Sequence, residues 1–426
     1  MDLTEILSNQ YEEIMSLNTS RLYTRKEEKE LDLDSSLAQI VIGVRRSGKS
    51  TLCQKVLIES GVKFAYINFD DENLVDVKAK DMNDLMAALY RVYGDFTHLF
   101  IDEVQNVEGW PLFVNRLLRG KLHLMITGSN ANLLSGELST HLAGRYNQIE
   151  LFPFSFDEYC RATNVDCRSK STKATALRHA ALDRYLFQGG FPELLNIKEG
   201  HKYVMSLLNA VLNKDICRRY NVRYKKTLSD MANGIVDHFC QEISYTNISK
   251  EYSLLSVHTA KNYIEYLTTA YLVCPVSKFS FKSTERQQAR KYYVVDPAFI
   301  SKRNDTLQTE NIGWRLENVV AIELMRRMDK EYQQLYYLRK EKSFEVDFMV
   351  VEAGHVNQLI QVTYDFSNPG TRLYNREIGG LIKGASATGC HNLTLVMMEG
   401  ENRDITLGGE TIHCLRATDW LLGNNM

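Results

Sequence analysis

One short segment near the N-terminus restricts the possible folds more than any other part of the sequence. Residues 37–42 form an apolar run, residues 43–50 read GVRRSGKS, and residues 51–60 have the composition of a helix. A short apolar run followed by a glycine-containing turn and a helix indicates a buried strand of a parallel sheet. The turn fits the spacing G-x-x-x-x-G-K-[ST] without departure, so the sequence predicts an α/β domain with a phosphate-binding loop.

The residue types in this loop match the chemistry of a nucleoside triphosphate. Gly43 and Gly48 allow backbone N–H groups to face the phosphates, where side chains would collide. Lys49 is expected to place its charge between the β- and γ-phosphates, and Ser50 to offer its hydroxyl to Mg²⁺. No guanine-type Asn-Lys-x-Asp motif is present, which favours ATP over GTP. The predicted nucleotide-binding residues are Gly43, Arg45, Arg46, Ser47, Gly48, Lys49, Ser50 and Thr51, and the predicted cofactors are ATP and Mg²⁺.

Two acids follow a second apolar run, residues 98–101. Asp102 is expected beside Ser50 as a magnesium ligand, and Glu103 is placed to orient and deprotonate the attacking water. A further strand-like run, residues 64–69, lies between the loop and the acids in the sequence. An extra strand at this place and a glutamate after the aspartate resemble the additional-strand, catalytic-glutamate branch of the ATPases that contain such a phosphate-binding loop. A strand that ends in a solvated acidic turn is the alternative.

Two more candidate catalytic residues come later in the same half of the chain. Residues 122–126 form another apolar run, and Thr127-Gly128-Ser129-Asn130 follows it. Asn130 or Ser129 is expected to sense the γ-phosphate, although this polar tip could instead cap a helix. Arg145 is a candidate arginine finger that would reach the nucleotide of a neighbouring subunit, which implies a homo-oligomer. A surface salt bridge is the alternative for Arg145.

Five segments in this order resemble a large prokaryotic family of AAA-type ATPases of poorly defined role: GVRRSGKST, LFIDEVQNVEGWPLFVNRLL, ITGSNANLLSGELSTHLAGR, LFPFSFDEY and FQGGFPE. The resemblance covers nearly the whole chain. It implies an AAA-type P-loop ATPase core over residues 1–155, a helical lid over 156–213, a winged-helix segment over 214–305 and a restriction-endonuclease-like α/β domain over 306–426. It also implies Asn130 as the sensor and Arg145 as the finger.

The middle of the chain is locally basic. Residues 214–295 hold 13 Lys and Arg against 7 Asp and Glu, whereas the whole chain has a net charge of −2. A helix over 249–255, a turn, a helix over 259–267 and a strand over 272–279 outline a winged helix-turn-helix. Such a segment is a candidate for DNA contact, with solvated charges on a domain-packing module as the alternative. The residues expected to face DNA are Ser256, His258, Thr259, Lys261, Asn262, Lys278, Lys282, Arg286, Arg290 and Lys291.

The C-terminal part resembles an endonuclease core in which some of the catalytic residues are missing. In that core an acid on the first helix, an aspartate on a strand and Glu-x-Lys on the next strand converge on a metal. Glu317 and Asp347 match this pattern, but Gln361-Val362-Thr363 supplies neither the carboxylate nor the lysine. Asp365 is a candidate substitute for the missing acid. We therefore expect a binding or assembly role rather than nuclease activity.

Length and composition limit the remaining possibilities. A chain of 426 residues is expected to form about two to four domains. Its 8 cysteines are scattered without a Cys-x-x-Cys pair, which favours reduced thiols over disulfides or zinc. The acidic N-terminus does not resemble a signal peptide, and no apolar run reaches the roughly 18 residues of a membrane span, so we expect a cytoplasmic protein.

Two functional hypotheses follow from these features. The first is a magnesium-dependent ATPase that couples its nucleotide state to DNA or to assembly. The alternative is a nucleotide-dependent regulatory switch that acts on protein partners and carries a catalytically degenerate nuclease-like domain.

Overall fold

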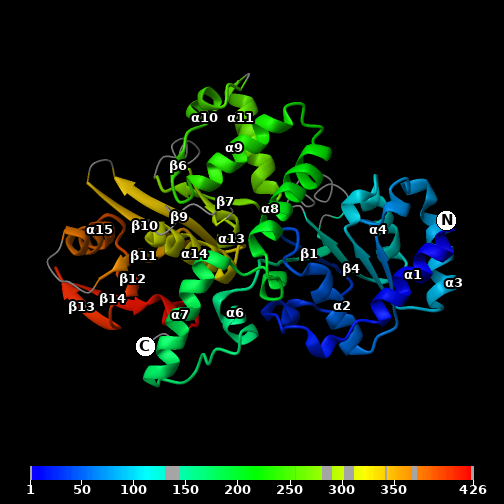
Figure 1. The fold of residues 1–426 in the computed structure, drawn as a ribbon, viewed down its shortest axis with the longest axis horizontal. Helices are drawn as coiled ribbons and strands as arrows, with labels where there is room; N and C mark the ends of the chain where they lie inside the picture. Colours follow the sequence, from blue (N-terminus) through cyan, green and yellow to red (C-terminus); the bar gives the residue numbers. More distant parts are fainter. Residues whose placement is uncertain are drawn as a thin grey trace. The chain divides into compact units, whose positions relative to one another are not determined.

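The computed structural model describes residues 2–129, 142, 144–254, 256–280, 290–301, 311–340, 343–366 and 372–423. The chain divides into two compact units (Figure 1). The first contains Met1–Pro153 and Thr269–Tyr271, and the second contains Phe154–Thr268 and Leu272–Met426. Within the described ranges, every helix is too short or too polar to cross a membrane.

The first unit is built on a five-stranded sheet in the order β2-β3-β4-β1-β5. All four strand pairs are parallel. Its strands are β1 (Ala38–Ile42), β2 (Phe64–Asn68), β3 (His98–Asp102), β4 (His123–Gly128) and β5 (Tyr146–Glu150). The run at residues 64–69 therefore forms an edge strand, and β4 is the strand that separates β1 from β3. The carboxyl ends of β1, β4 and β3 consequently lie side by side, which brings together the residues that follow them.

Helices cover this sheet and bury its strands. They are α1 (Leu3–Met15), α2 (Lys49–Ser60), α3 (Met82–Tyr93) and α4 (Trp110–Arg119), with short 3-10 turns at Thr19–Arg21, Lys26–Glu30, Glu72–Leu74, Ala79–Asp81 and Val104–Asn106. All residues of β1 and β3 are buried, as expected for strands covered on both faces. Leu52 and Leu57 of α2 pack with Val41, Phe100 and Met125 in one apolar cluster, which fixes the helix that begins in the phosphate loop.

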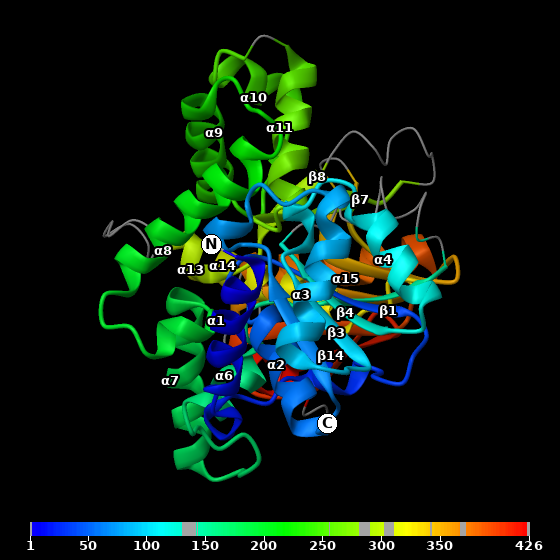
Figure 2. The ribbon, with the colours of Figure 1, turned by 90° about the vertical axis from the view of Figure 1, so that its right-hand side faces the viewer.

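The second unit begins with helices. They are α6 (Phe156–Ala162), α7 (Thr172–Gln188), a 3-10 turn at Pro192–Leu195, α8 (Gly200–Ala210), a π-helical continuation at Val211–Arg218, α9 (Lys225–Asp237), α10 (Tyr245–Glu251) and α11 (Val257–Thr269). Helices α9, α10 and α11 lie together in both views (Figures 1 and 2). Helices α10 and α11 occupy the place of the two helices predicted for the helix-turn-helix, although α10 begins four residues earlier than expected.

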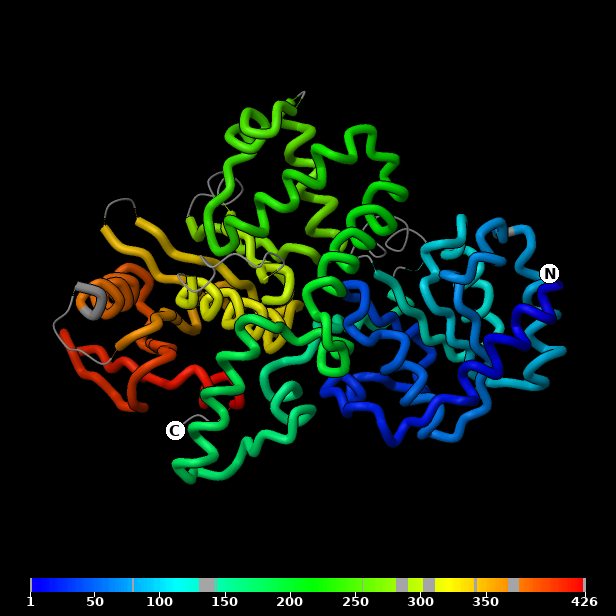
Figure 3. The backbone as a smooth tube through the Cα atoms, viewed as in Figure 1, coloured from blue at the N-terminus to red at the C-terminus, as the bar shows by residue number. Residues whose placement is uncertain are grey.

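A nine-stranded mixed sheet forms the rest of this unit, in the order β13-β14-β12-β11-β10-β9-β7-β8-β6. Its strands are β6 (Glu242–Ile243), β7 (Val273–Lys278), β8 (Arg290–Val294), β9 (Gln333–Lys340), β10 (Phe344–Glu352), β11 (His355–Asp365), β12 (Leu393–Glu399), β13 (Arg403–Leu407) and β14 (Glu410–Arg416). The remaining helices are α13 (Pro297–Ile300), α14 (Ile312–Arg327), α15 (Arg372–Thr388) and α16 (Ala417–Leu421). In the tube of Figure 3, the yellow-to-orange segments that contain β10, β11 and β12 run beside one another.

The sheet continues across the boundary that the sequence suggests at residues 305/306. Strand β7, expected in the winged-helix segment, pairs in parallel with β9 of the C-terminal part through Ser277 and Tyr336. The strands assigned to a wing and those assigned to an endonuclease-like core thus share one hydrogen-bonded sheet. This pairing joins segments about 60 residues apart, which local sequence patterns do not reveal.

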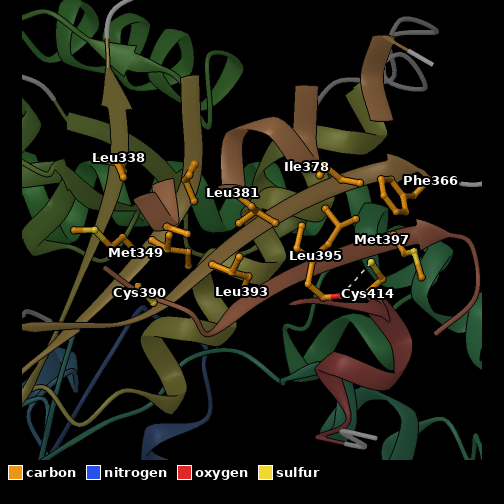
Figure 4. Close-up of a cluster of buried hydrophobic side chains, with 14 of the residues drawn as sticks. Leu338, Met349, Phe366, Ile378, Leu381, Cys390, Leu393, Leu395, Met397 and Cys414 are labelled. Carbon is orange, nitrogen blue, oxygen red and sulfur yellow. Dashed lines mark hydrogen bonds between the residues drawn. The ribbon is translucent and has the colours of Figure 1, made fainter. Parts of the chain in front are cut away.

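Helix α15 packs closely on this sheet. Its apolar side chains, including Ile378 and Leu381, join those of β10, β11 and β12 in one layer (Figure 4). Two glycines allow the close approach. A Cβ atom on Gly380 would lie 2.6 Å from the Glu345 carbonyl oxygen, and one on Gly384 would lie 2.9 Å from Val346 Cγ2. The middle of α15 therefore lies close against β10.

Candidate nucleotide-binding site

The phosphate loop connects the end of β1 to the start of α2. Gly43 and Gly48 have φ angles of 150° and 98°. A Cβ atom on Gly43 would lie only 2.1 Å from the carbonyl oxygen of Leu151, so any other residue would displace the backbone here. Gly48 is the N-cap of α2, which leaves the first N–H groups of the helix without intrahelical partners. Such a helix start is suited to an anion.

The side chain of Lys49 lies inside this loop. It is 4% exposed, and its ammonium group donates hydrogen bonds of 3.1 Å to the carbonyl oxygens of Gly43 and Val44. Ser47 has a buried hydroxyl oxygen that makes no hydrogen bond with the described residues. Arg45 forms a 3.2 Å ion pair with Asp70, and Arg46 has a positive φ of 69°. The loop thus contains the buried ammonium group of Lys49 and the buried hydroxyl of Ser47, and a ligand can form hydrogen bonds with both groups.

Arg25 supports the loop from behind. Its guanidinium donates to the Ser47 carbonyl oxygen at 3.0 Å and to the Phe152 carbonyl oxygen at 2.7 Å. The side chain is buried, at 5% exposure. Sequence reasoning missed this residue because it lies in a charged stretch, RKEEKE, that matches no motif. Its contacts, which span 22 and 127 residues of sequence, appear only in the folded chain.

Asp102, the first acid of the pair, lies against Ser50, whose hydroxyl is the predicted magnesium ligand in the loop. Ser50 Oγ donates a 2.9 Å hydrogen bond to Asp102 Oδ1, and Thr127 at the end of β4 donates to the same oxygen. Tyr66 of β2 donates to Asp102 Oδ2 at 3.3 Å. Burial, together with the charge of Glu103, raises the pKa of Asp102 to about 6. Thr127 and Tyr66 were not predicted as site residues.

The second acid is held by a glutamine. Glu103 has a φ of 52°, in the left-handed region, and its N–H donates to Thr127 Oγ1 at 3.1 Å. The Gln105 amide nitrogen donates to Glu103 Oε2 and, at 3.4 Å, to Ser129 Oγ. The Gln105 amide oxygen is buried and has no hydrogen-bond partner in the described part of the chain. Ser129, one of the two predicted sensors, is therefore near Glu103, whereas Asn130 lies outside the described residues.

Arg145 is exposed just before β5, and it donates a 2.6 Å hydrogen bond to Asn115 Oδ1 on α4. The finger role of Arg145 stays a prediction.

The residues expected to face DNA are placed in different environments. Ser256, His258 and Lys261 are exposed at the start of α11, and Ser256 Oγ accepts the Thr259 N–H at 3.1 Å. Lys282 and Arg286 lie outside the described residues. The expectation for Lys291 is wrong: it is 6% exposed and forms ion pairs with Glu317 at 3.2 Å and Glu345 at 2.8 Å. Because this ammonium group is buried and already ion-paired, it does not lie on the surface as a DNA contact of a wing requires.

The two acids of the endonuclease-like pattern lie in the second unit. Glu317 on α14 forms an ion pair with Lys291 of β8. The Asp347 backbone N–H donates to Gln361 Oε1 at 3.2 Å. Gln361 donates in turn to Glu377 on α15 at 2.6 Å. Asp365 is half-buried at the end of β11. Searched over its described residues, the chain contains no group of three or more His, Cys, Asp or Glu side chains that could hold a metal ion.

Comparison with known proteins gives family-model matches to two segments of the chain and relatives that match most of its length. A family model described as an AAA domain matches residues 35–160, and one described as a domain of unknown function matches residues 179–308. An uncharacterized protein of Methanocaldococcus jannaschii is 32% identical over 352 residues, which are 79% of this chain and 77% of that protein. An uncharacterized protein of Haemophilus influenzae is 31% identical over 347 residues, which are 78% of this chain and 84% of that protein.

Solved structures give weaker likenesses. A Walker-type ATPase of Pyrococcus abyssi aligns with a TM-score of 0.42 and 14% identity, over 66% of this chain and 95% of that one. The branch migration motor RuvB of Thermotoga maritima aligns with a TM-score of 0.30 and 18% identity, over 59% and 89%. Scores this low do not establish a common fold for the whole chains. The match to an AAA domain, however, confirms the P-loop core that the sequence predicts.

Proposed function

We propose that this chain binds ATP with Mg²⁺ and hydrolyses it. The chain belongs to the same family as the Methanocaldococcus and Haemophilus proteins, and it carries an AAA domain. The observation that supports this most directly is the 2.9 Å hydrogen bond between Ser50 and Asp102. It joins the phosphate loop to the acid at the end of β3. A hydroxyl and a carboxylate in contact, beside a buried lysine, are the groups that P-loop ATPases use for Mg²⁺ and phosphate.

The loop residues fit a triphosphate by their own chemistry. At Gly43 the neighbouring backbone leaves no space for a side chain. The Ser47 hydroxyl is buried and has no hydrogen-bond partner among the described residues. Lys49 would exchange its two carbonyl contacts for phosphate oxygens, which form stronger, charge-assisted hydrogen bonds. Ser50 and Asp102 would hold Mg²⁺, which supplies charge neutralisation at the phosphates.

Glu103 is the proposed catalytic base. Its carboxylate is oriented by Gln105, and its backbone is fixed by Thr127. A carboxylate held in this way can accept a proton from an attacking water. We assign the sensor role to Asn130 and the finger role to Arg145, and the latter requires a second copy of the chain.

The direct test is phosphate release by the purified full chain. Glu103→Gln should retain nucleotide binding and lose turnover by at least about 100-fold, because the amide cannot accept a proton. Glu108→Gln is the matched control, since Glu108 is an exposed carboxylate in the same segment, and it should turn over ATP at the wild-type rate. Wild-type turnover by Glu103→Gln would remove Glu103 from the mechanism.

We further propose that the nucleotide state is coupled to DNA. The exposed positions at the start of α11 and the local excess of basic residues motivate this part. Turnover measured with and without duplex and single-stranded DNA tests it. Stimulation by DNA that disappears when Lys261, Lys278, Lys282 and Arg286 are neutralised together is the expected result. Turnover that is indifferent to DNA, with no binding at low salt, would contradict it.

A regulatory switch acting on protein partners is the second candidate. The net charge of the chain is only −2, and the carboxylate and lysine of Glu-x-Lys are replaced by Gln361 and Thr363. This candidate predicts slow hydrolysis and nucleotide-dependent oligomerisation, seen by light scattering, without any requirement for DNA.

A further inference from the structure

One cysteine of the chain differs from the others in its surroundings. All 8 cysteines lie within the described residues, and all are free thiols. Cys167 is partly exposed, whereas the others are buried. It lies in residues 163–171, the segment between α6 and α7, which has no part in the proposed ATPase chemistry. A partly exposed thiol can meet reagents from solvent that the buried thiols cannot.

The chain folds back after α6 and brings Cys167 to a second cysteine, Cys160. Cys160 lies in the last turn of α6, and its carbonyl oxygen accepts the Val165 N–H at 2.8 Å. Asn164 has a φ of 56°, in the left-handed region that asparagine tolerates, and this turns the chain. The Cys167 thiol then donates to the Val165 carbonyl oxygen at 3.5 Å. These backbone contacts return the segment to the end of the helix that it has just left.

Arg178 of α7 holds the returning segment in place. Its guanidinium donates to the carbonyl oxygens of Asp166 at 3.1 Å and Ser169 at 2.7 Å, one on each side of Cys167 in the sequence. The Arg178 side chain is 4% exposed, and α7 itself packs against α6 (Figure 1). The position of Cys167 is therefore fixed by a buried side chain of the neighbouring helix.

The two thiols differ in their chemistry. The Cys160 thiol donates a hydrogen bond to the Cys167 sulfur, and this bond raises the pKa of Cys160 and lowers the pKa of Cys167. Partial burial and Asp157 act against the lowering at Cys167, whereas the cations Arg178 and Arg161 add to it. Asp157 is itself paired with Arg161 at 2.8 Å. Cys167 is therefore the thiol that ionises more readily, and the thiolate is the reactive form of cysteine.

We propose that Cys167 is a site of reversible oxidation by hydroperoxides and that Cys160 converts the oxidised residue to a disulfide. An accessible cysteine that ionises readily and lies beside a second cysteine has the features of redox-responsive thiols. The bond ties the end of α6 to the segment that leads into α7. The contacts of Val165 and Arg178 already hold these two parts together.

The reaction takes place in two steps. The Cys167 thiolate attacks a peroxide oxygen, so that a sulfur–oxygen bond forms, the oxygen–oxygen bond breaks, and the leaving oxygen takes up a proton. The sulfur thereby loses two electrons to the peroxide and becomes a sulfenic acid. The Cys160 thiol gives up its proton and attacks this sulfur, the disulfide forms, and the sulfenic oxygen leaves as water. A dithiol then restores both thiols by exchange and is itself oxidised to a disulfide.

The test uses the full chain, reduced and then freed of reductant, with hydrogen peroxide as the oxidant. The reacted protein is alkylated, unfolded and digested with trypsin, which cuts between the two cysteines after Arg161. Peptides 146–161 and 162–168 should remain joined, as mass spectrometry detects, and dithiothreitol should separate them. Joined peptides that are absent, or that form only when peroxide is added after unfolding in urea, would overturn the inference.

Serine variants assign the two roles. Cys160→Ser should lose the joined peptides and accumulate a sulfenic acid at Cys167, which dimedone traps. Cys167→Ser should also lose them, and Cys160 should stay unlabelled by dimedone because a buried, protonated thiol reacts poorly. Cys390→Ser is the matched control, since Cys390 is a buried cysteine at 4% exposure outside this segment, and it should form the joined peptides like the wild type.

Equal dimedone labelling of Cys160 in Cys167→Ser and of Cys167 in Cys160→Ser would contradict these roles. Loss of the joined peptides in Cys390→Ser would do so as well. The oxidation requires neither ATP nor its turnover, so the outcome is independent of the proposed ATPase.

Discussion

Ser50 and Asp102 are separated by 52 positions in the sequence, yet the serine hydroxyl donates a 2.9 Å hydrogen bond to the aspartate carboxylate. The contact exists because β4 lies between β1 and β3 in the sheet, and because Thr127 at the end of β4 donates a hydrogen bond to the same carboxylate. The two predicted magnesium ligands are therefore held next to each other by the protein itself, and such preorganisation reduces the ordering that nucleotide binding requires.

The pH dependence of nucleotide binding should follow Asp102. Burial and the neighbouring Glu103 raise the pKa of Asp102 to about 6. Only the carboxylate form can hold Mg²⁺, so the fraction able to bind falls as the pH drops through that value. Affinity for ATP in Mg²⁺ should therefore be lower at pH 5 than at pH 7.5 by about tenfold. Calorimetric titration at both pH values measures it, and affinity independent of pH would show that Asp102 is not the ligand.

Arg25 should stabilise the phosphate loop. Arg25→Ala removes two charge-assisted hydrogen bonds and leaves the buried Ser47 and Phe152 carbonyl oxygens without that partner. The free energy of unfolding should fall by about 2–3 kcal/mol, and nucleotide affinity should fall with it. Urea denaturation measures the first quantity. Arg21→Ala is the control, because Arg21 is exposed in the same segment, and a similar loss in both variants would contradict the assignment.

Gln105 should tune the catalytic glutamate. In Gln105→Glu a second carboxylate replaces the amide that donates to Glu103. Two adjacent like charges disfavour ionisation, so the acidic limb of the rate–pH profile should move to higher pH in this variant. Turnover measured from pH 5 to pH 9 shows the displacement. An unchanged profile would mean that Gln105 does not act on Glu103 during turnover.

Two adjacent glycines on α15 should respond oppositely to alanine. A Cβ atom on Gly380 would lie 2.6 Å from the Glu345 carbonyl oxygen, whereas one on Gly379 would meet nothing within 4 Å. Gly380→Ala should destabilise the protein by about 1–3 kcal/mol through overpacking. Gly379→Ala should stabilise it by up to about 1 kcal/mol through helix propensity. Thermal unfolding of both variants, compared with the wild type, would contradict this packing if the two shifts had the same sign.

Local patterns in the sequence were sufficient for the parts of the site that lie on one segment. The phosphate loop has fixed spacing between a strand and a helix, so Gly43, Lys49 and Ser50 could be proposed as site residues without knowledge of the fold. Asp102 could be proposed for the same reason, since an apolar strand that ends in two acids is a local signal. The AAA-domain match confirms the core in which these residues lie.

Contacts between distant segments could not be predicted in this way. Arg25, Tyr66 and Thr127 match no motif, and they become site residues only when the sheet order brings them to the loop or to Asp102. Lys291 was misjudged because composition shows a basic segment but not which of its side chains is buried. Its place beside Glu317 depends on how β8 packs against α14, and that packing has no signature in one sequence.

We propose that Lys49, Ser50 and Asp102 act together on one bound triphosphate. Calorimetric titration of ATP in Mg²⁺ into the wild type, Lys49→Ala and Asp102→Asn tests it most directly. We expect one site per chain in the wild type and at least about tenfold weaker binding in each variant. In EDTA, the wild type and Asp102→Asn should converge, because the aspartate acts through the ion. Undiminished binding by both variants, or no binding by the wild type at millimolar ATP, would contradict it.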